Sequence, residues 1–145
     1  MQLKIKKLHP NAQVPAAATS GSAGLDLCAC LECPAEILPG QRLRVPTGLS
    51  IALPDPAFAA FAFARSGLAS RHGLALANSV GVIDSDYRGE VILCMINHGT
   101  EAYTILPGER VAQLVILPVC VPQVLEVDEL TETDRGTGGF GSTGK

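Results

Sequence analysis

The chain has 145 residues, which is enough for one domain with a hydrophobic core and too few to expect two. Its net charge is −3, so no basic field draws in nucleic acid, and we expect no nucleic-acid partner. No apolar run approaches the length of a membrane span, so we expect no membrane association. The 15 glycines and 10 prolines divide the sequence into short segments, which favours β structure with many turns.

Taken in chain order, the segments are typical of short strands separated by turn residues. Strands are predicted at residues 3–8, 25–30, 43–45, 47–53, 58–64, 74–78, 80–83, 91–97, 103–106, 111–117 and 124–127, with one short helix at 68–72. This pattern predicts an all-β, jelly-roll-like β-barrel as a single domain. We assign residues 1–130 to the domain and residues 131–145 to a flexible, glycine-rich C-terminal arm.

The five cysteines and the N-terminal segment bear on the compartment. The count is odd, and the first residues alternate polar and apolar without a signal sequence, so a reducing cytoplasm is expected. Cys28, Cys30 and Cys33 are closely spaced, as in some metal sites. They have no nearby histidine and no second cysteine pair, which favours small buried apolar residues instead.

Two polar residues interrupt apolar strands and need partners. Gln113 lies within the apolar run 111–117, where either a satisfied core amide or a ligand contact would account for it. Asp26 has the same two explanations. A buried carboxylate requires an arginine or a metal, and Arg110 is the candidate arginine.

Two loops carry groups suited to chemistry. Arg65, Ser66 and Gly67 follow an apolar strand and offer a forked cation and two further donors to phosphate oxygens, although such a triplet alone is usually a turn. Residues 80–83 and 91–97 flank residues 84–89, which are typical of a β-hairpin with a polar tip that includes Tyr87. The preference of Asp and Ser for turns explains most of the residues in that tip. It explains Asp84 less well, because Asp84 directly follows apolar residues, and a carboxylate there could orient and deprotonate water.

The last eleven residues, 135–145, contain five glycines, one arginine and one aromatic residue, and they cannot build a core. Glycine lets backbone N–H groups converge on an anion. Residues 139–145 imitate the start of a phosphate-binding P-loop, but no strand precedes them and no helix follows, so this interpretation fails. A frayed tail and an arm that closes over a phosphorylated ligand both fit the composition.

Five blocks of sequence resemble the trimeric dUTPase family in the family's order. They lie at residues 23–27, 65–69, 81–89, 108–113 and 135–144 and span nearly the whole chain. The resemblance implies a homotrimer with active sites at the subunit boundaries, each covered by a C-terminal arm. It implies Mg²⁺-assisted hydrolysis of dUTP to dUMP and pyrophosphate, which supplies dUMP for dTMP synthesis and keeps uracil out of DNA.

The resemblance also implies a role for each matching residue. Asp84 would activate water, Tyr87 would exclude a ribose 2′-OH, and Asp26 would contact Mg²⁺ through water. The residues implied to bind uracil are Asn78, Val82, Ile83, Ile92 and, by stacking, Phe140. Those implied to bind the phosphates are Arg65, Ser66, Gly67, Gln113, Arg135, Gly141, Ser142 and Thr143.

Two other functions remain open from sequence. A dCTP deaminase shares the implied fold, but such chains tend to be longer and lack the tip that carries Asp84 and Tyr87. A non-catalytic nucleotide-binding trimer would not need Asp84 or a complete arm.

Overall fold

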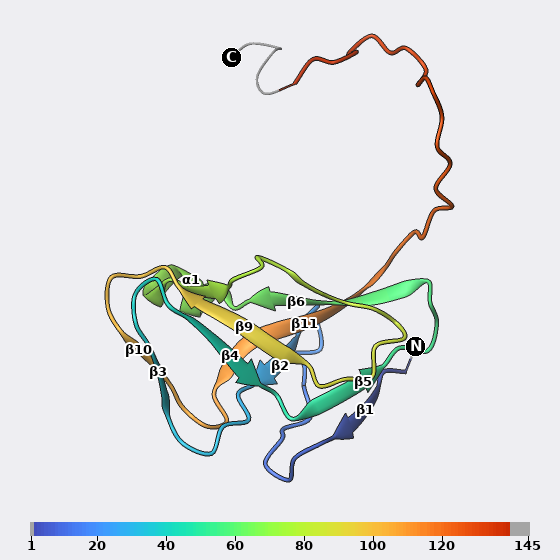
Figure 1. The fold of residues 1–145 in the computed structure, drawn as a ribbon. Coiled ribbons are helices and arrows are strands. Elements are labelled where there is room, and N and C mark those ends of the chain that lie inside the picture. Colours follow the sequence, from blue (N-terminus) through green and yellow to red (C-terminus); the bar gives the residue numbers. More distant parts are fainter. Residues whose placement is uncertain (1, 140–145) are drawn as a thin grey trace.

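The computed structural model describes residues 2–139, so the arm residues Phe140, Gly141, Ser142 and Thr143 lie outside the described part. The strands are β1 (Lys4–Lys7), β2 (Leu25–Cys28), β3 (Ala35–Ile37), β4 (Arg42–Pro46), β5 (Leu49–Ala52), β6 (Phe58–Ala64), β7 (Leu74–Leu76), β8 (Gly81–Ile83), β9 (Ile92–Asn97), β10 (Tyr103–Ile105) and β11 (Arg110–Pro118). The helix α1 (Ser66–His72) joins β6 to β7 (Figure 1). No helix among the described residues is long and apolar enough to cross a membrane.

The strands form antiparallel sheets packed around one core. One sheet has the order β2-β11-β6-β8 and another the order β4-β9-β7, while β1 pairs with β5 and β3 with β10. The largest fully buried side chains come from most of these strands: Leu27, Ile37, Val45, Leu49, Leu74, Leu93, Met95, Ile105, Val111 and Leu114. The predicted all-β, jelly-roll-like fold is confirmed, although its strands are divided among separate sheets and do not form one continuous barrel.

The centre of the larger sheet is the pairing of β6 with β11. Seven residues of each strand are in register, from Ala112 opposite Ala64 to Pro118 opposite Phe58. Neighbouring side chains on a strand point to opposite faces, so alternation of alanine and phenylalanine gives β6 a small-residue face and an aromatic face. Ala60 and Ala62 are buried in the core, whereas Phe61 and Phe63 are only partly buried on the other face.

The prediction that residues 80–83 and 91–97 pair as a hairpin is wrong. Strand β8 pairs with β6, and β9 pairs with β4 and β7, so the two segments belong to different sheets. Both segments are apolar and adjacent in sequence, but each finds its apolar partners elsewhere. Residues 84–91 therefore cross from one sheet to the other.

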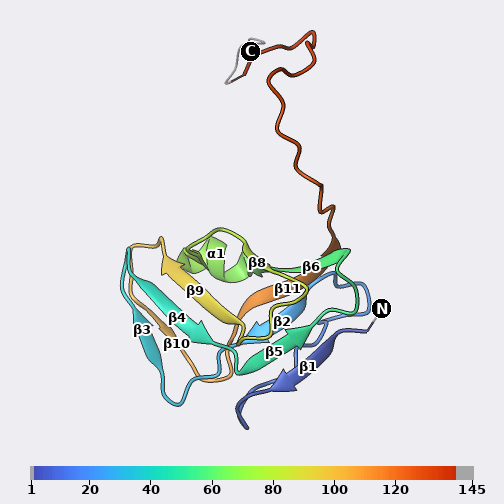
Figure 2. The ribbon, with the colours of Figure 1, turned by 45° about the vertical axis from the view of Figure 1, so that its right-hand side comes forward.

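The predicted strand at 124–127 is also absent, and a short strand that was not predicted, β3, is present. The chain leaves the body after β11, where the Val119 N–H donates to the Ala57 carbonyl. Beyond that point Val124 and Leu130 are 89% and 87% exposed. Figures 1 and 2 show this segment curving away from the body, so it has no strand partner among the described residues.

Candidate active site

A cavity of about 660 Å³ opens where β2, β6 and β11 meet α1, and we call it the arginine pocket. Its lining residues are Ala18, Ser22, Ala23, Gly24, Asp26, Phe63, Arg65, Ser66, Gly67, Leu68, Arg71, His72, Arg110, Gln113 and Val115. The structure thus brings together Asp26, the 65–67 triplet and Gln113, although they come from distant parts of the sequence. Sequence reasoning singled out neither Arg71 nor His72 as a site residue.

An ion-paired carboxylate fixes the arginines of this pocket. Arg65 Nε donates to Asp26 Oδ1 at 3.0 Å, and Arg110 Nη1 donates to Asp26 Oδ2 at 3.0 Å. Arg65 Nη1 also donates to the Arg110 carbonyl at 3.2 Å. The Asp26 side chain is only 18% exposed, so pairing with two guanidinium groups compensates the loss of its hydration. The predicted contact between Asp26 and Arg110 is confirmed.

The same carboxylate affects a neighbouring thiol. Partial burial raises the pKa of Cys28, and the nearby Asp26 charge raises it further. Cys28 and Cys30 are partly buried and Cys33 is exposed. Within residues 2–139, no three His, Cys, Asp or Glu side chains lie close enough together to hold a metal ion.

The helix α1 begins directly at the triplet. Arg65 is its N-cap in an extended conformation, so Ser66 and Gly67 open the first turn, where backbone N–H groups have no intrahelical acceptor. The helix ends at Gly73, whose φ of +69° suits glycine. The short helix therefore presents a hydroxyl and backbone donors beside the fixed Arg65.

Gln113 has both a structural and a pocket contact. Its Nε2 donates to the Ala64 carbonyl at 3.0 Å, which satisfies the amide, and the side chain lines the arginine pocket. A Cβ atom on Gly24 would lie 2.6 Å from Gln113 Oε1. Glycine at position 24 therefore leaves room for the Gln113 side chain across the β2–β11 pair.

A second cavity, of about 320 Å³, lies between β8 and the start of β9, and we call it the loop pocket. It is lined by Arg44, Ala62, Asn78, Gly81, Val82, Ile83, Asp84, Tyr87, Glu90, Val91, Ile92 and Leu93. It exists because β8 and β9 do not pair. β8 is the edge strand of its sheet, so backbone groups along its outer edge are free of ladder hydrogen bonds.

The loop pocket brings together the second set of predicted site residues. Asp84 follows the last residue of β8 and is exposed, and Tyr87 lies beyond a turn closed by its N–H to the Asp84 carbonyl. The Tyr87 hydroxyl donates to the Glu90 carbonyl at 3.0 Å. Asn78 precedes Ser79, which adopts a left-handed φ of +62° in the turn that leads to β8. Sequence reasoning missed Arg44 and Glu90, which no local motif distinguishes.

The two pockets share no lining residue. The arginine pocket touches β6 through Phe63, and the loop pocket touches it through Ala62. Within this chain the two sets of groups therefore line separate cavities.

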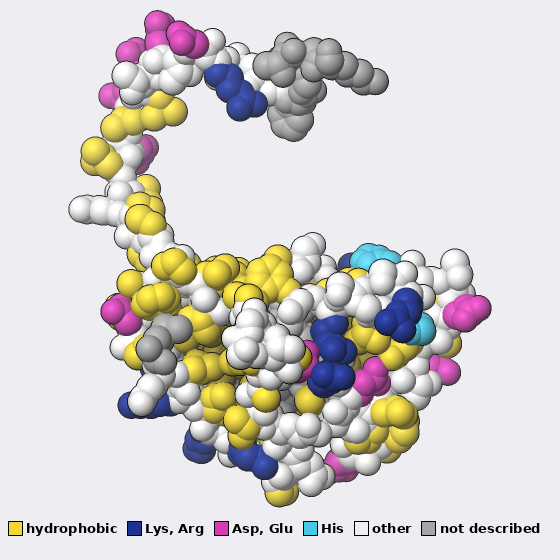
Figure 3. Space-filling view, turned by 180° about the vertical axis from the view of Figure 1, so that it is seen from behind, with side chains coloured by type: hydrophobic (Ala, Val, Ile, Leu, Met, Phe, Trp, Pro, Cys, Tyr) yellow, Lys and Arg dark blue, Asp and Glu magenta, His cyan; other side chains and the backbone are white. Residues whose placement is uncertain are grey.

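Arg135 lies in neither pocket. It is exposed on the arm, where its Nε donates to the Gly138 carbonyl at 2.9 Å. Figure 3 shows the segment after β11, with the arm at its end, standing clear of the body. The structure does not bring Arg135 to Arg65, Ser66, Gly67 or Gln113 of its own chain.

Comparisons with known proteins agree with one another. A family model described as dUTPase matches residues 10–144. The chain is 52% identical over 145 residues to a deoxyuridine 5'-triphosphate nucleotidohydrolase of Burkholderia cenocepacia (strain HI2424), covering 100% of this chain and 98% of that protein. It is 55% identical over 132 residues to the enzyme of that name from Desulfitobacterium hafniense (strain DSM 10664 / DCB-2), covering 91% and 87%. The Staphylococcus bacteriophage 80alpha dUTPase with dUPNHPP superposes with a TM-score of 0.88 at 25% identity, covering 99% of each chain.

Proposed function

The chain belongs to the dUTPase family, and we propose on that premise that it hydrolyses dUTP to dUMP and pyrophosphate. The loop pocket is the observation that carries the proposal. It combines a free sheet edge, an aromatic side chain and one exposed carboxylate, Asp84, which directly follows that edge. The free edge would bind the base, the aromatic side chain would pack against the sugar, and the carboxylate would activate the attacking water.

The free edge of β8 suits recognition of uracil. Backbone N–H and C=O groups of Val82 and Ile83 offer donors and acceptors at fixed spacing, and the Asn78 side chain adds an amide. Ile92, on the other side of the pocket, limits its width. Cytosine exchanges a donor for an acceptor and would leave site groups unpaired, while the methyl group of thymine would meet the pocket wall.

Tyr87 is proposed to pack against the deoxyribose. Its hydroxyl is already bonded to the Glu90 carbonyl, so the ring is held in place before substrate arrives. A ring fixed against the sugar leaves no room for a 2′-hydroxyl. Discrimination against UTP then follows from shape.

Arg65, Ser66, Gly67 and Gln113 are proposed to bind the phosphates in the arginine pocket. A triphosphate carries about four negative charges, and converging donors of fixed position stabilise such charge best. Arg135 is proposed to join them when the arm closes, with Gly141, Ser142 and Thr143 around the phosphates and Phe140 on the base. Arm closure would exclude water during the reaction.

The donor set fits Mg²⁺ carried mainly by the substrate. Mg²⁺ keeps several waters and usually binds through one or two carboxylates plus substrate phosphates. Asp26 is the carboxylate of the arginine pocket, and both its oxygens already accept from arginines, which favours a contact through water. The bound ion would neutralise charge on the triphosphate.

Asp84 is proposed to act as the general base. It takes a proton from a water whose oxygen forms a bond to the α-phosphorus. The bond from that phosphorus to the bridging oxygen breaks, and pyrophosphate leaves with the bonding pair. General-base catalysis of this kind contributes about 100- to 10,000-fold.

We propose that the functional site forms between subunits of a homotrimer. The two pockets share no lining residue, so Asp84 and Arg65 line separate cavities of one subunit. The outer face of β6 and its neighbours also presents a row of partly or fully exposed apolar side chains, Phe61, Val82 and Val115, in register across the sheet. Such a face is typical of a subunit interface.

The decisive assay measures pyrophosphate and ammonia separately with Mg²⁺ and dUTP, dCTP, dTTP or UTP. We expect pyrophosphate from dUTP alone. Ammonia from dCTP would replace the proposal with a deaminase, and no product from any nucleotide would leave a binding protein.

A complementation experiment tests the shared site. Co-expressed subunits carrying Asp84→Asn or Arg65→Ala should be inactive alone and should regain part of the activity in mixed trimers, where some sites combine two intact pockets. Absence of recovery in trimers shown to be mixed would contradict a site built from two subunits.

A further inference from the structure

The segment 84–91 carries Asp84 and Tyr87 but contains no strand or helix. It leaves one sheet at β8 and enters another at β9, so no ladder of backbone hydrogen bonds holds it along its length. The positions of the base and the sugar wall therefore depend on individual contacts.

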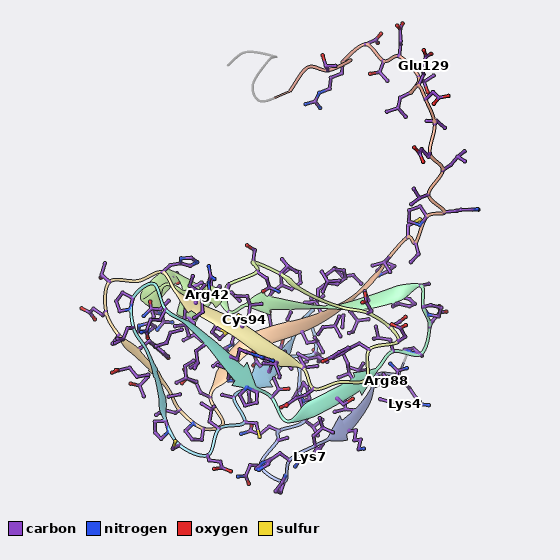
Figure 4. All side chains as sticks on the ribbon, in the orientation of Figure 1. Lys4, Lys7, Arg42, Arg88, Cys94 and Glu129 are labelled. Carbon is purple, nitrogen blue, oxygen red and sulfur yellow. The ribbon has the colours of Figure 1, made fainter. Side chains whose placement is uncertain are left out.

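The second half of this segment is bound to the turn between β4 and β5 and to β5 itself. The Gly48 N–H donates to Glu90 Oε1 at 2.7 Å, and Ser50 Oγ donates to the Arg88 carbonyl at 2.8 Å. Thr47 Oγ1 donates to the Val91 carbonyl at 2.6 Å. Figure 4 shows Arg88 beside β5, in agreement with these contacts.

The Gly48 end of the contact is fixed by the core. Gly48 has a φ of +67°, and a Cβ atom there would lie 2.8 Å from Ala12 Cβ and 2.9 Å from Cys30 Sγ. Glycine is required at this position, and its N–H is directed at Glu90 by the surrounding packing. A hydrogen bond from a rigid backbone donor to a carboxylate is short and strong compared with a neutral one.

Glu90 links that fixed donor to the sugar wall. Its carboxylate accepts from Gly48, while its own carbonyl accepts from the Tyr87 hydroxyl at 3.0 Å. Tyr87 and Glu90 both line the loop pocket. Holding the Glu90 side chain therefore holds the backbone oxygen that sets the position of the Tyr87 ring.

We infer that Glu90 is a positioning residue that determines sugar specificity by anchoring Tyr87 to Gly48. This inference rests on the proposed function, because it concerns discrimination between dUTP and UTP at the same pocket. Without the anchor, the Tyr87 ring gains freedom to move aside and admit a 2′-hydroxyl. Asp84 lies at the other end of the segment, next to β8, and is held less directly by Glu90.

The test compares Glu90→Ala, Glu90→Gln and the control Asp86→Ala, whose side chain is exposed in the same segment and lines neither pocket. In Glu90→Ala we expect the dUTP/UTP ratio of kcat/KM to fall about tenfold, with KM for dUTP rising more than kcat falls. Glu90→Gln should recover much of the ratio, because its amide oxygen can still accept from Gly48. Asp86→Ala should keep the wild-type ratio.

The inference would be overturned if folded Glu90→Ala kept the wild-type dUTP/UTP ratio of kcat/KM. It would also be overturned if Glu90→Ala were less stable but otherwise unchanged. Hydrogen exchange provides a readout without substrate. The peptide covering 84–91 should exchange faster in Glu90→Ala than in Asp86→Ala, and unchanged protection would also overturn the inference. If the unaltered chain does not hydrolyse dUTP, the proposed function fails, whereas the exchange measurement still decides whether Glu90 anchors the segment.

Discussion

The arginine pocket and the loop pocket hold their functional groups by different means. In the arginine pocket, one carboxylate fixes two cations, and the groups come from regular strands and a helix. In the loop pocket, the functional groups are a backbone edge, an aromatic ring and a loop, and the loop is held by single contacts. The difference suits the two halves of a nucleotide, because phosphates require charge and a base with its sugar requires shape and hydrogen-bond pattern.

The largest expected effect comes from the one proposed proton acceptor. Asp84→Asn should lower kcat for dUTP by about 1,000-fold, because the amide cannot take the proton from water. Binding of a non-hydrolysable dUTP analogue, measured by calorimetry, should stay near the wild-type value. Asp86→Asn is the matched control and should turn over normally. Near-normal kcat in Asp84→Asn would remove this residue as the base.

Removal of residues 135–145 should lower kcat/KM by about 100-fold, because the proposed closing arginine and the donors beyond it are lost. The shortened protein should keep the proposed trimeric state in sedimentation, since the strands of the body are intact. A variant lacking only Lys145 serves as the control. Full activity after the longer truncation would mean that the arm does not cover the site.

Asp26→Asn tests the charge-fixed pocket. The substitution leaves Arg65 and Arg110 without their shared carboxylate, so the guanidinium groups should shift and kcat/KM for dUTP should fall by about 30-fold. The dUTP/UTP ratio should not change, because the loop pocket is untouched. Glu36→Gln, in the exposed part of β3, is the control. A change in sugar preference would show that the two pockets are not independent.

The smallest expected effect concerns shape. Tyr87→Ala should lower the dUTP/UTP ratio of kcat/KM by about tenfold, because the wall against the 2′-hydroxyl is removed. Tyr87→Phe keeps the ring but loses the bond to the Glu90 carbonyl, so it should also lower the ratio, by no more than Tyr87→Ala does. A wild-type ratio in Tyr87→Phe would mean that this bond does not hold the ring in place.

The two pockets also differ in how far sequence could predict them. The contact of Asp26 with Arg110 was predicted as one of two possibilities, an arginine or a metal, from the cost of burying an unpaired carboxylate. The strand at residues 58–64 and the helix around 68–72 follow from local patterns, and both are present.

The loop pocket was less predictable because strand pairing is not a local property. The sequence around β8 and β9 has the pattern of a hairpin, yet each strand pairs in a different sheet. Glu90 has no local signal, since its function depends on Gly48, which is 42 residues away in sequence. Residues 124–127 have the sequence pattern of a strand, but they are exposed in the structure. Local strand preference alone does not supply the neighbouring strand that a sheet requires.

The free edge of β8 has a consequence for the solution behaviour of the protein. An edge that must remain open to read a base can also pair with a strand of another molecule and start aggregation. Here the exposed edge is only three residues long, and it ends at the charged Asp84. The proposed catalytic carboxylate therefore also limits intermolecular strand pairing, so replacing it by a neutral residue should make the protein more prone to aggregate as well as inactive.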